Sequence, residues 1–212
     1  MMAEASPGLA RLIAQLRKEN AAGERVLEAM AAAPREKFVP ESFRDQAYFD
    51  AALPLTSGQT ISQPWVVASM TQALDVQPTH KVLEIGTGSG WQSAILARLA
   101  GTVCTIERHA TLSRGARAVL GGLGITNVRY RVADGSLGWP EEAPFDRIMV
   151  TAAADKAPPP ALLAQLSPEG GVMLVPVKEG DDGEHLWRVT RTGKEISRIR
   201  LSAVRFVPLV AG

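Results

Sequence analysis

Cysteine and histidine are scarce in this sequence: Cys104 stands alone, and the three histidines His80, His109 and His185 lie far apart. A single cysteine cannot form an internal disulfide or a multi-cysteine zinc site, and histidines so widely spaced form no local metal motif. Cys104 falls within an apolar stretch and is interpreted as a small core residue. We therefore expect a protein without a metal, in a reducing compartment such as the cytoplasm.

The chain also lacks an excess of charge and a long apolar run. It has 23 Lys+Arg against 22 Asp+Glu, a net charge of +1, which argues against a protein that mainly binds nucleic acid. No stretch approaches the roughly 18 uncharged apolar residues of a membrane span, and residues 1–7 lack the charged start and apolar run of a secretion signal. We expect a cytoplasmic monomer that binds neither nucleic acid nor membranes.

The remaining composition is that of a folded globular chain: 212 residues, 46% hydrophobic and 21% charged, enough for one domain with its own core. Ser6-Pro7 is typical of a helix start, and apolar residues three or four apart follow it. A second helix is predicted to end before Pro34. Residues 35–64 show no strong periodicity, and a connection of this length is usually functional.

From Pro64 onward a helix is followed by alternating strands and helices, which is typical of parallel βαβ units. The tail lacks intervening helices and carries a hairpin turn at 191–194. Its basic residues are interpreted as protection of an exposed sheet edge rather than as a nucleic-acid stripe. We predict a Rossmann-like, doubly wound α/β fold: a mostly parallel seven-stranded sheet with an antiparallel C-terminal edge and an N-terminal helical extension. Eight segments are candidates for these strands: 81–85, 102–106, 128–132, 147–150, 171–175, 186–190, 196–201 and 204–207.

A glycine-rich turn, Gly86-Thr87-Gly88-Ser89-Gly90, lies between the first of these strands and the next helix. Glycines in this context let backbone N–H groups approach a ligand closely. A dinucleotide site needs another glycine where Trp91 stands, and the lysine of a phosphate loop is absent, because Gln92 and Ser93 follow. The turn therefore predicts a nucleoside ligand without a diphosphate.

The next two strands end in acids. Glu107, 21 residues after Gly86, is placed to accept hydrogen bonds from both hydroxyls of a ribose. Asp134, followed by Gly135, ends the third strand, where it can read an adenine amino group. Each feature alone is also consistent with a surface acid or a turn. The three strand ends together favour a nucleoside site.

Five segments that run in order over nearly the whole chain carry a further signal: 34–39, 53–64, 83–90, 144–153 and 204–209. In these segments the sequence resembles the protein-L-isoaspartate O-methyltransferase family. The glycine turn is shared by many methyltransferases, whereas residues 58–64 and 204–209 are more specific to this family. Two departures stand out: Thr56 replaces a usual glycine, which predicts a stiffer substrate loop, and Trp91 replaces a usual tyrosine.

The resemblance implies S-adenosylmethionine as methyl donor and S-adenosylhomocysteine as product. The acceptor is the free carboxylate of an L-isoaspartyl (or D-aspartyl) residue in a damaged protein or peptide, and the ester then closes to a succinimide. It also implies a single methyltransferase domain over residues 1–212, in which 1–63 form a helical and substrate-loop extension and 64–212 the donor-binding core. The last two strands of the family's sheet are exchanged relative to most methyltransferases, with one antiparallel.

The resemblance also assigns roles to residues. Ser62 is the catalytic residue, and Thr60, Ile61 and Val207 bind the substrate. The donor-binding residues are Gly86, Thr87, Gly88, Ser89, Glu107, Arg108, Asp134 and Gly135.

The chemistry is consistent with these roles. Methyl transfer needs in-line attack from about 3–3.5 Å, and a neutral acceptor needs a base or a metal. No His/Asp pair or metal cluster lies near the motifs. A carboxylate, with a reference pKa of about 4, is already anionic at pH 7 and needs only orienting hydroxyls, such as those of Thr60 and Ser62. Ser62 could instead cap the helix that starts at Pro64.

Three alternatives stay open at this point. One is another methyltransferase, acting on a small carboxylic acid or on RNA, and methylation of an isoaspartyl peptide but not of its normal twin separates it. The second is a nucleoside-binding module without activity, against which intact Glu107, Asp134 and Ser62 argue. The third is a nicotinamide dehydrogenase, against which Trp91 argues.

Overall fold

The computed structural model describes residues 6–210. Residues 1–5 and 211–212, where the outer limits of the predicted domain and most of the stretch examined for a secretion signal fall, lie outside the described residues. The helices are α1 Pro7–Lys18, α2 Glu24–Ala31, α3 Pro64–Leu74, α4 Trp91–Leu99, α5 Ala110–Gly122 and α6 Pro160–Gln165. The strands are β1 Leu53–Pro54, β2 Thr60–Ile61, β3 Lys81–Ile85, β4 Thr102–Glu107, β5 Val128–Val132, β6 Arg147–Val150, β7 Ala154–Asp155, β8 Glu169–Lys178, β9 Glu184–Thr192 and β10 Glu195–Ala203.

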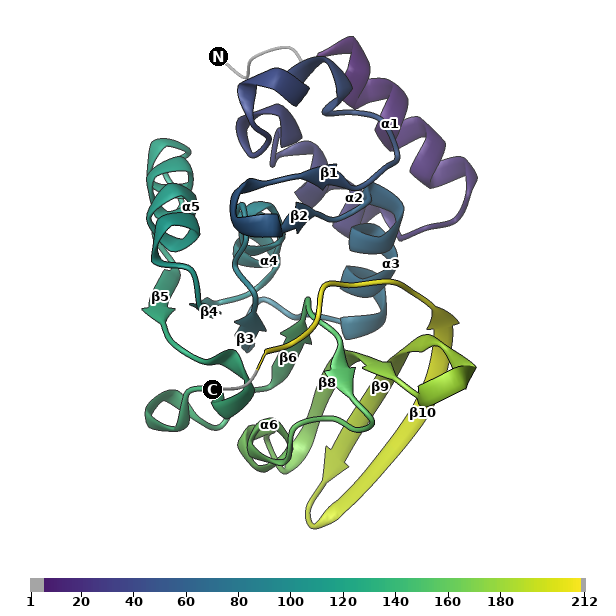
Figure 1. Ribbon diagram of the computed structural model, residues 1–212, viewed down its shortest axis with the longest axis vertical. Helices are drawn as coiled ribbons and strands as arrows, with labels where there is room; N and C mark the ends of the chain where they lie inside the picture. The colour runs from purple at the N-terminus through teal and green to yellow at the C-terminus, as the bar shows by residue number, and fades with distance from the viewer. Residues whose placement is uncertain (1–5, 211–212) are drawn as a thin grey trace.

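A central sheet organises the molecule (Figure 1). Its strand order is β10-β9-β8-β6-β3-β4-β5, and the short β7 pairs with β8. Strands β3, β4, β5, β6 and β8 run parallel, whereas β9 runs antiparallel to both β8 and β10. This confirms the predicted mostly parallel sheet of seven main strands with an antiparallel edge, to which β7 is an addition.

Successive residues of the strands point into two separate hydrophobic cores. In β3, Val82 packs with the core that includes residues of α1 to α5, whereas Leu83 and Ile85 pack on the opposite face, where α6 contributes Leu162. This alternation follows from the pleat of a strand, whose side chains point to opposite faces in turn. Helices therefore cover both faces, as the doubly wound prediction requires.

The C-terminal hairpin confirms one expectation and corrects another. Strand β9 ends at Thr192 and β10 begins at Glu195, so the predicted turn is Gly193-Lys194, and every residue of the edge strand β10 is exposed. The predicted strand at 204–207 is wrong. Residues 204–210, hereafter the C-terminal strap, leave the sheet, and Val207 and Leu209 hydrogen-bond through their main chains to Ala153, in the loop after β6. An alternating pattern cannot distinguish a sheet strand from an extended segment that pairs with a loop.

The connection between α2 and α3 contains short elements that no periodicity announced. Its 3-10 turns lie at 35–37, 41–46 and 56–58. Between them β1 and β2 pair as a small hairpin, with Leu53 opposite Ile61. The positive φ angles at its tip fall on Ser57 and Gly58. The backbone at Thr56 therefore does not require the glycine that is usual in the family.

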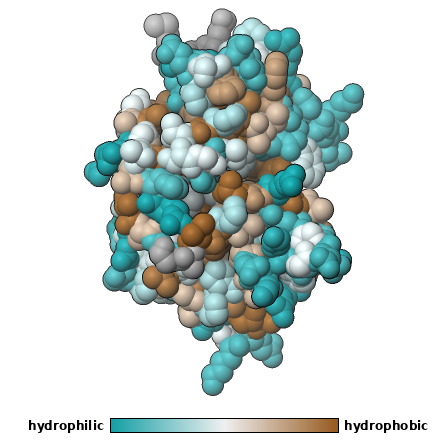
Figure 2. All heavy atoms as spheres, in the orientation of Figure 1, coloured by the Kyte–Doolittle hydropathy of each residue, from teal (hydrophilic) through white to brown (hydrophobic). Residues whose placement is uncertain are grey.

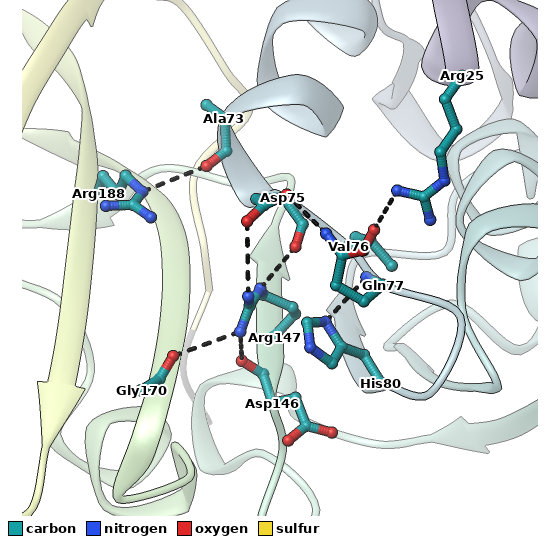
Figure 3. Close-up of polar contacts among 10 residues, drawn as sticks. All are labelled: Arg25, Ala73, Asp75, Val76, Gln77, His80, Asp146, Arg147, Gly170 and Arg188. Carbon is teal, nitrogen blue, oxygen red and sulfur yellow. Dashed lines mark hydrogen bonds and ion pairs between the residues drawn. The ribbon is translucent and has the colours of Figure 1, made fainter.

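Helix α3 begins at this hairpin and ends at the opposite edge of the sheet. Its last turn stops at Asp75, which has left-handed φ/ψ angles. Three arginines donate to main-chain oxygens there: Arg188 Nε to Ala73 (3.3 Å), Arg147 Nε to Asp75 (3.1 Å) and Arg25 Nη1 to Val76 (2.7 Å) (Figure 3). Cations at a helix C-terminus satisfy free carbonyls and complement the helix dipole.

Two further features bear on function. Among residues 6–210, no helix combines the length and apolar character that crossing a membrane requires. In the same part of the chain, His, Cys, Asp and Glu side chains form no group of three that could hold a metal ion.

Candidate active site

A cavity of about 1030 Å³ opens at the carboxyl ends of the parallel strands. Its walls come from the turn after β3, the end of β4, Gly135 after β5, Thr151 after β6, the β1–β2 hairpin, α3 and the C-terminal strap. Figure 2 shows apolar patches among hydrophilic side chains across the middle of the face that carries the strap. A crevice at this edge is where open α/β sheets bind their ligands.

The turn after β3 can be built only with glycine. Gly86, Gly88 and Gly90 have φ angles of 95°, 53° and 88°, in the left-handed region that side chains disfavour. A Cβ on Gly86 would lie 2.4 Å from Thr151 Oγ1. That hydroxyl is 2.9 Å from the carbonyl oxygens of both Ile85 and Gly86. Residues 86–90 are hereafter called the donor turn, and its first four residues line the cavity.

Glu107, the last residue of β4, links the end of this strand to the turn after β3. Its side chain is buried, with Oε2 accepting the Gly88 N–H and Oε1 the His109 N–H, each at 2.9 Å. A carboxylate has about four lone-pair sites, so these two bonds leave capacity for further donors. A buried carboxylate with spare acceptor capacity beside a glycine turn can accept hydrogen bonds from ligand hydroxyls.

A second carboxyl, Glu84, lies beneath the donor turn and is fully buried. It accepts hydrogen bonds from the hydroxyls of Ser93 and Thr105, the latter at 2.6 Å. Thr105 Oγ1 is in turn 2.6 Å from Thr87 Oγ1, within the donor turn. Burial raises the pKa of Glu84 to about 7, although both hydroxyls oppose the rise. The donor turn is therefore connected, through the Thr105 hydroxyl, to a carboxyl whose pKa is near neutral.

The opposite wall of the cavity carries Ser62. None of the described residues forms a hydrogen bond with its hydroxyl, and Ser62 lines the cavity. The start of α3 is capped instead by Asp50, whose Oδ1 accepts the Trp65 N–H at 2.8 Å and whose Oδ2 accepts Gln63 Nε2 at 2.9 Å. The alternative in which Ser62 caps this helix is therefore wrong. The serine hydroxyl stays available to a ligand.

The C-terminal strap closes one side of the cavity. Glu184 holds it near its start, with Oε1 accepting the Phe206 N–H at 2.7 Å. Ala153 N–H donates to the Val207 oxygen at 2.8 Å. Arg108 reaches the Val210 oxygen at 3.4 Å from the end of β4. Arg108, which the resemblance assigns to donor binding, thus also links the donor side to the strap.

Eleven of the twelve residues that the sequence singled out line this one cavity; they are Thr60, Ile61, Ser62, Gly86, Thr87, Gly88, Ser89, Glu107, Arg108, Gly135 and Val207. Asp134 is not part of the lining. Its Oδ1 accepts the main-chain N–H and the hydroxyl of Ser136, at 2.8 and 2.7 Å. The reading of an adenine by Asp134 stays a prediction.

Sequence reasoning missed several residues of the site. Trp65 and Met70 of α3, with Phe206 of the strap, add apolar surface to the cavity. Asp50 and Arg35 lie behind its wall and bind the chain around Ser62. One signal was present: Gln63 is a poor residue for the position before Pro64 in a helix start, so the capping group had to come from elsewhere.

The sheet order, the glycine turn after β3 and Glu107 at the end of β4 together define an S-adenosylmethionine-dependent methyltransferase of the Rossmann-like class. The family model of protein-L-isoaspartate(D-aspartate) O-methyltransferase matches residues 9–212, and the chain belongs to this family. Membership argues against the dehydrogenase and against a module without activity.

Individual relatives agree. The chain is 54% identical to the protein-L-isoaspartate O-methyltransferase of Parvibaculum lavamentivorans, over 95% of this chain and 90% of the relative. It is 50% identical to that of Paramagnetospirillum magneticum, over 100% and 98%. A solved protein-L-isoaspartate O-methyltransferase superposes with a TM-score of 0.87 at 26% identity, over 96% of this chain and 66% of that one.

A second solved structure bears on the cofactor. A Plasmodium falciparum structure, described as a protein-L-isoaspartate O-methyltransferase in complex with S-adenosyl-L-homocysteine, superposes with a TM-score of 0.81 at 25% identity, over 94% of this chain and 97% of that one. The methyl donor of this family is S-adenosylmethionine.

Proposed function

We propose that this chain transfers the methyl group of S-adenosylmethionine to the free carboxylate of L-isoaspartyl residues, and of D-aspartyl residues, in damaged proteins and peptides. The methyl ester then closes to a succinimide, whose hydrolysis returns some normal aspartate. The observation that carries the proposal is the single cavity in which the hydroxyl of Ser62 lies on one wall and the donor turn on another. An acceptor other than a protein is not favoured, because the relatives that match nearly the whole chain are named for protein L-isoaspartate.

The donor side follows from the turn and the strand ends. The main chain of Gly86 and Gly88 would lie against the donor, and Glu107 would accept hydrogen bonds from its ribose. Gly135 lines the cavity and packs directly against Ile85, since a Cβ there would lie 2.4 Å from Ile85 Cγ2. When bound, S-adenosylmethionine supplies an electrophilic methyl group on a positively charged sulfur.

The acceptor side needs no strong base. The acceptor carboxylate is ionised at neutral pH, so Ser62 and Thr60 have only to donate hydrogen bonds that hold one of its oxygens in line for attack. Ile61, which is buried, and the strap around Val207 exclude water from this point. Charge is cancelled as the ester forms, so a site with little water favours the step.

The test is methyl transfer to two peptides that differ only in an isoaspartyl or a normal aspartyl residue. We expect transfer to the first alone, and Ser62→Ala to lower kcat by about 100-fold with little change in donor affinity, as when an oriented donor is removed from an active site. Ser69→Ala is the matched control, because the Ser69 hydroxyl already donates to Val66 O within α3. Equal turnover of Ser62→Ala and wild type would remove Ser62 from the mechanism.

We further propose that the protein works as a cytoplasmic monomer that binds neither nucleic acid nor membranes, with residues 1–63 and 64–212 forming the extension and core of one domain. The single cysteine supports a reducing compartment such as the cytoplasm, and the net charge of +1 supports a protein that does not bind nucleic acid. Light scattering on the purified chain tests the oligomeric state; a dimer at micromolar concentration would contradict it.

A further inference from the structure

Arg35 is a completely buried cation that lies behind the wall carrying Ser62. Its Nη1 donates to Ala47 O at 2.8 Å and lies 3.4 Å from Phe49 O. Its Nη2 donates to Ala51 O and to Ser62 O, each at 2.9 Å. One guanidinium therefore binds both residues 47–51 and Ser62, two parts of the chain that form no regular pairing with each other.

The face of the same guanidinium lies on the donor side of the site. Its carbon is 5.0 Å from the centre of the Trp91 ring, a cation–π distance. Trp91 is buried, directly follows Gly90 of the donor turn, and donates from Nε1 to Ala33 O at 2.9 Å. Arg35 thus contacts the donor side through its face and the acceptor side through its edges.

Asp50 provides a second link between the same two stretches. It belongs to the loop whose carbonyls Arg35 binds, and its carboxylate holds Gln63 and the start of α3. Burial lowers the pKa of Arg35 to about 10, with Asp50 opposing the fall, so the guanidinium stays charged at neutral pH. A buried charge is costly unless it is fully hydrogen-bonded, and within the described residues Arg35 Nε has no partner. Packing alone does not account for a cation here.

We propose that Arg35 is a positioning residue for methyl transfer, which fixes the main chain of Ser62, and through it the serine hydroxyl, at a set distance from the donor turn. The inference rests on the proposed function. Lysine keeps the charge but lacks the planar fork that spans several carbonyl oxygens. A displacement of about 1 Å at a reacting group can lower turnover by about 100-fold.

Arg147 offers a matched control at the opposite edge of the sheet. It too is a buried arginine that donates to main-chain oxygens, those of Asp75 (3.1 Å), Asp146 (2.8 Å) and Gly170 (3.4 Å) (Figure 3). Arg147→Lys removes the same kind of bonds as Arg35→Lys, but away from the cavity. A loss caused only by weaker folding will therefore be common to both variants.

The experiment compares wild type, Arg35→Lys and Arg147→Lys on an isoaspartyl peptide, with kcat, KM, the melting temperature and the affinity for S-adenosylhomocysteine by calorimetry. We expect Arg35→Lys to lose about 100-fold in kcat while its affinity for S-adenosylhomocysteine changes by less than about threefold. Arg147→Lys is expected to melt at a lower temperature with kcat unchanged. If both variants lose turnover in proportion to their loss of stability, Arg35 is a structural residue only.

A second variant covers the case in which Arg35→Lys does not fold. Asp50→Ala removes the Gln63 bond and one helix cap, a loss that a folded domain tolerates. We expect a loss of about tenfold in kcat with unchanged affinity for S-adenosylhomocysteine. Unchanged kcat in this variant contradicts the proposal. Absence of turnover by the wild type on any isoaspartyl peptide would instead contradict the proposed function, so the two failures are distinct.

Discussion

The two ends of α3 are fastened by the same chemistry with different partners. At its C-terminus, Arg25, Arg147 and Arg188 donate to main-chain oxygens in the last turn of the helix or in the two residues after it. At its N-terminus, Arg35 donates to oxygens of an irregular loop and to Ser62. Regular elements keep their shape without the arginines, because their own main-chain bonds define it. The loop around Ser62 has few such bonds, so its geometry depends on the side chains that bind it.

This contrast separates the residues that stabilise the fold from the residues that set the geometry of the active site. Changes at the amino edge of the sheet should weaken folding and leave turnover intact, whereas changes at the carboxyl edge should alter binding or turnover beyond their effect on folding. The predictions for Gly86 and Arg25 test this division, and those for Glu84 and His80 measure how pH acts on the stability of each edge.

The largest effect is expected at the donor turn. Gly86→Ala places a Cβ 2.4 Å from Thr151 Oγ1 at a φ of 95°, so the turn must move. We expect at least about a 100-fold loss of affinity for S-adenosylhomocysteine, equivalent to about 3 kcal/mol, measured by calorimetry. Gly124→Ala is the control: its φ is also positive, at 69°, but its Cβ meets open space. Gly86→Ala that binds like Gly124→Ala would contradict the role of the turn.

The next effect is a pH dependence set by Glu84. Its folded-state pKa of about 7 lies above the ordinary value of 4.5. The stability it contributes is therefore complete below pH 4.5 and is lost as the pH rises to about 7, by about 3 kcal/mol. Urea unfolding of wild type and Glu84→Gln from pH 5 to 8 measures this. The variant should gain relative to wild type as pH rises; parallel curves would show that Glu84 is ionised throughout.

A smaller effect is expected at the C-terminus of α3. Arg25→Met removes bonds to Val76 O at 2.7 Å and Leu99 O at 3.1 Å. Hydrogen bonds of this kind contribute about 1–2 kcal/mol together, so urea unfolding should show a loss of that order. Turnover at saturating peptide should not change. A drop in kcat without a drop in stability would break the division between the two edges.

The smallest effect is a pH dependence opposite in sign at the same edge. Burial and the nearby Arg147 lower the pKa of His80, and its Nδ1 accepts the Gln77 N–H at 2.9 Å. Its contribution is therefore present above the ordinary pKa of about 6.5 and is lost as pH falls below that value. His80→Asn keeps an acceptor and should show less loss of stability between pH 7 and 5. An equal loss in both proteins would exclude His80 as its source.

The sheet and the donor turn could be predicted because their signals are local. Apolar runs such as Lys81–Ile85 mark buried parallel strands, and a glycine turn followed by Trp91 limits the ligand without reference to the rest of the chain. Glu107 at the end of β4 and Asp134 shortly after β5 lie at the same edge of the sheet because these strands are parallel. The strap escaped prediction because its partner, Ala153, is distant in sequence, and pattern shows extension but not the partner.

The wall behind Ser62 could not be predicted for a similar reason. Arg35 and Ser62 are 27 residues apart. The turns and strands between them are too short to set a periodicity that relates the two residues. When an arginine binds main-chain oxygens, the sequence does not show which residues it binds, because every residue has a main-chain carbonyl. Asp50 is likewise an ordinary loop acid until the start of α3 is placed beside it.

A structure of the protein with S-adenosylhomocysteine and an isoaspartyl peptide tests the account most directly. We predict the homocysteine sulfur beside the donor turn and the isoaspartyl carboxylate between it and the Ser62 hydroxyl, at a hydrogen-bond distance of about 2.7 Å. A peptide bound outside this cavity, or a Ser62 hydroxyl directed away from the carboxylate in the closed complex, would contradict it.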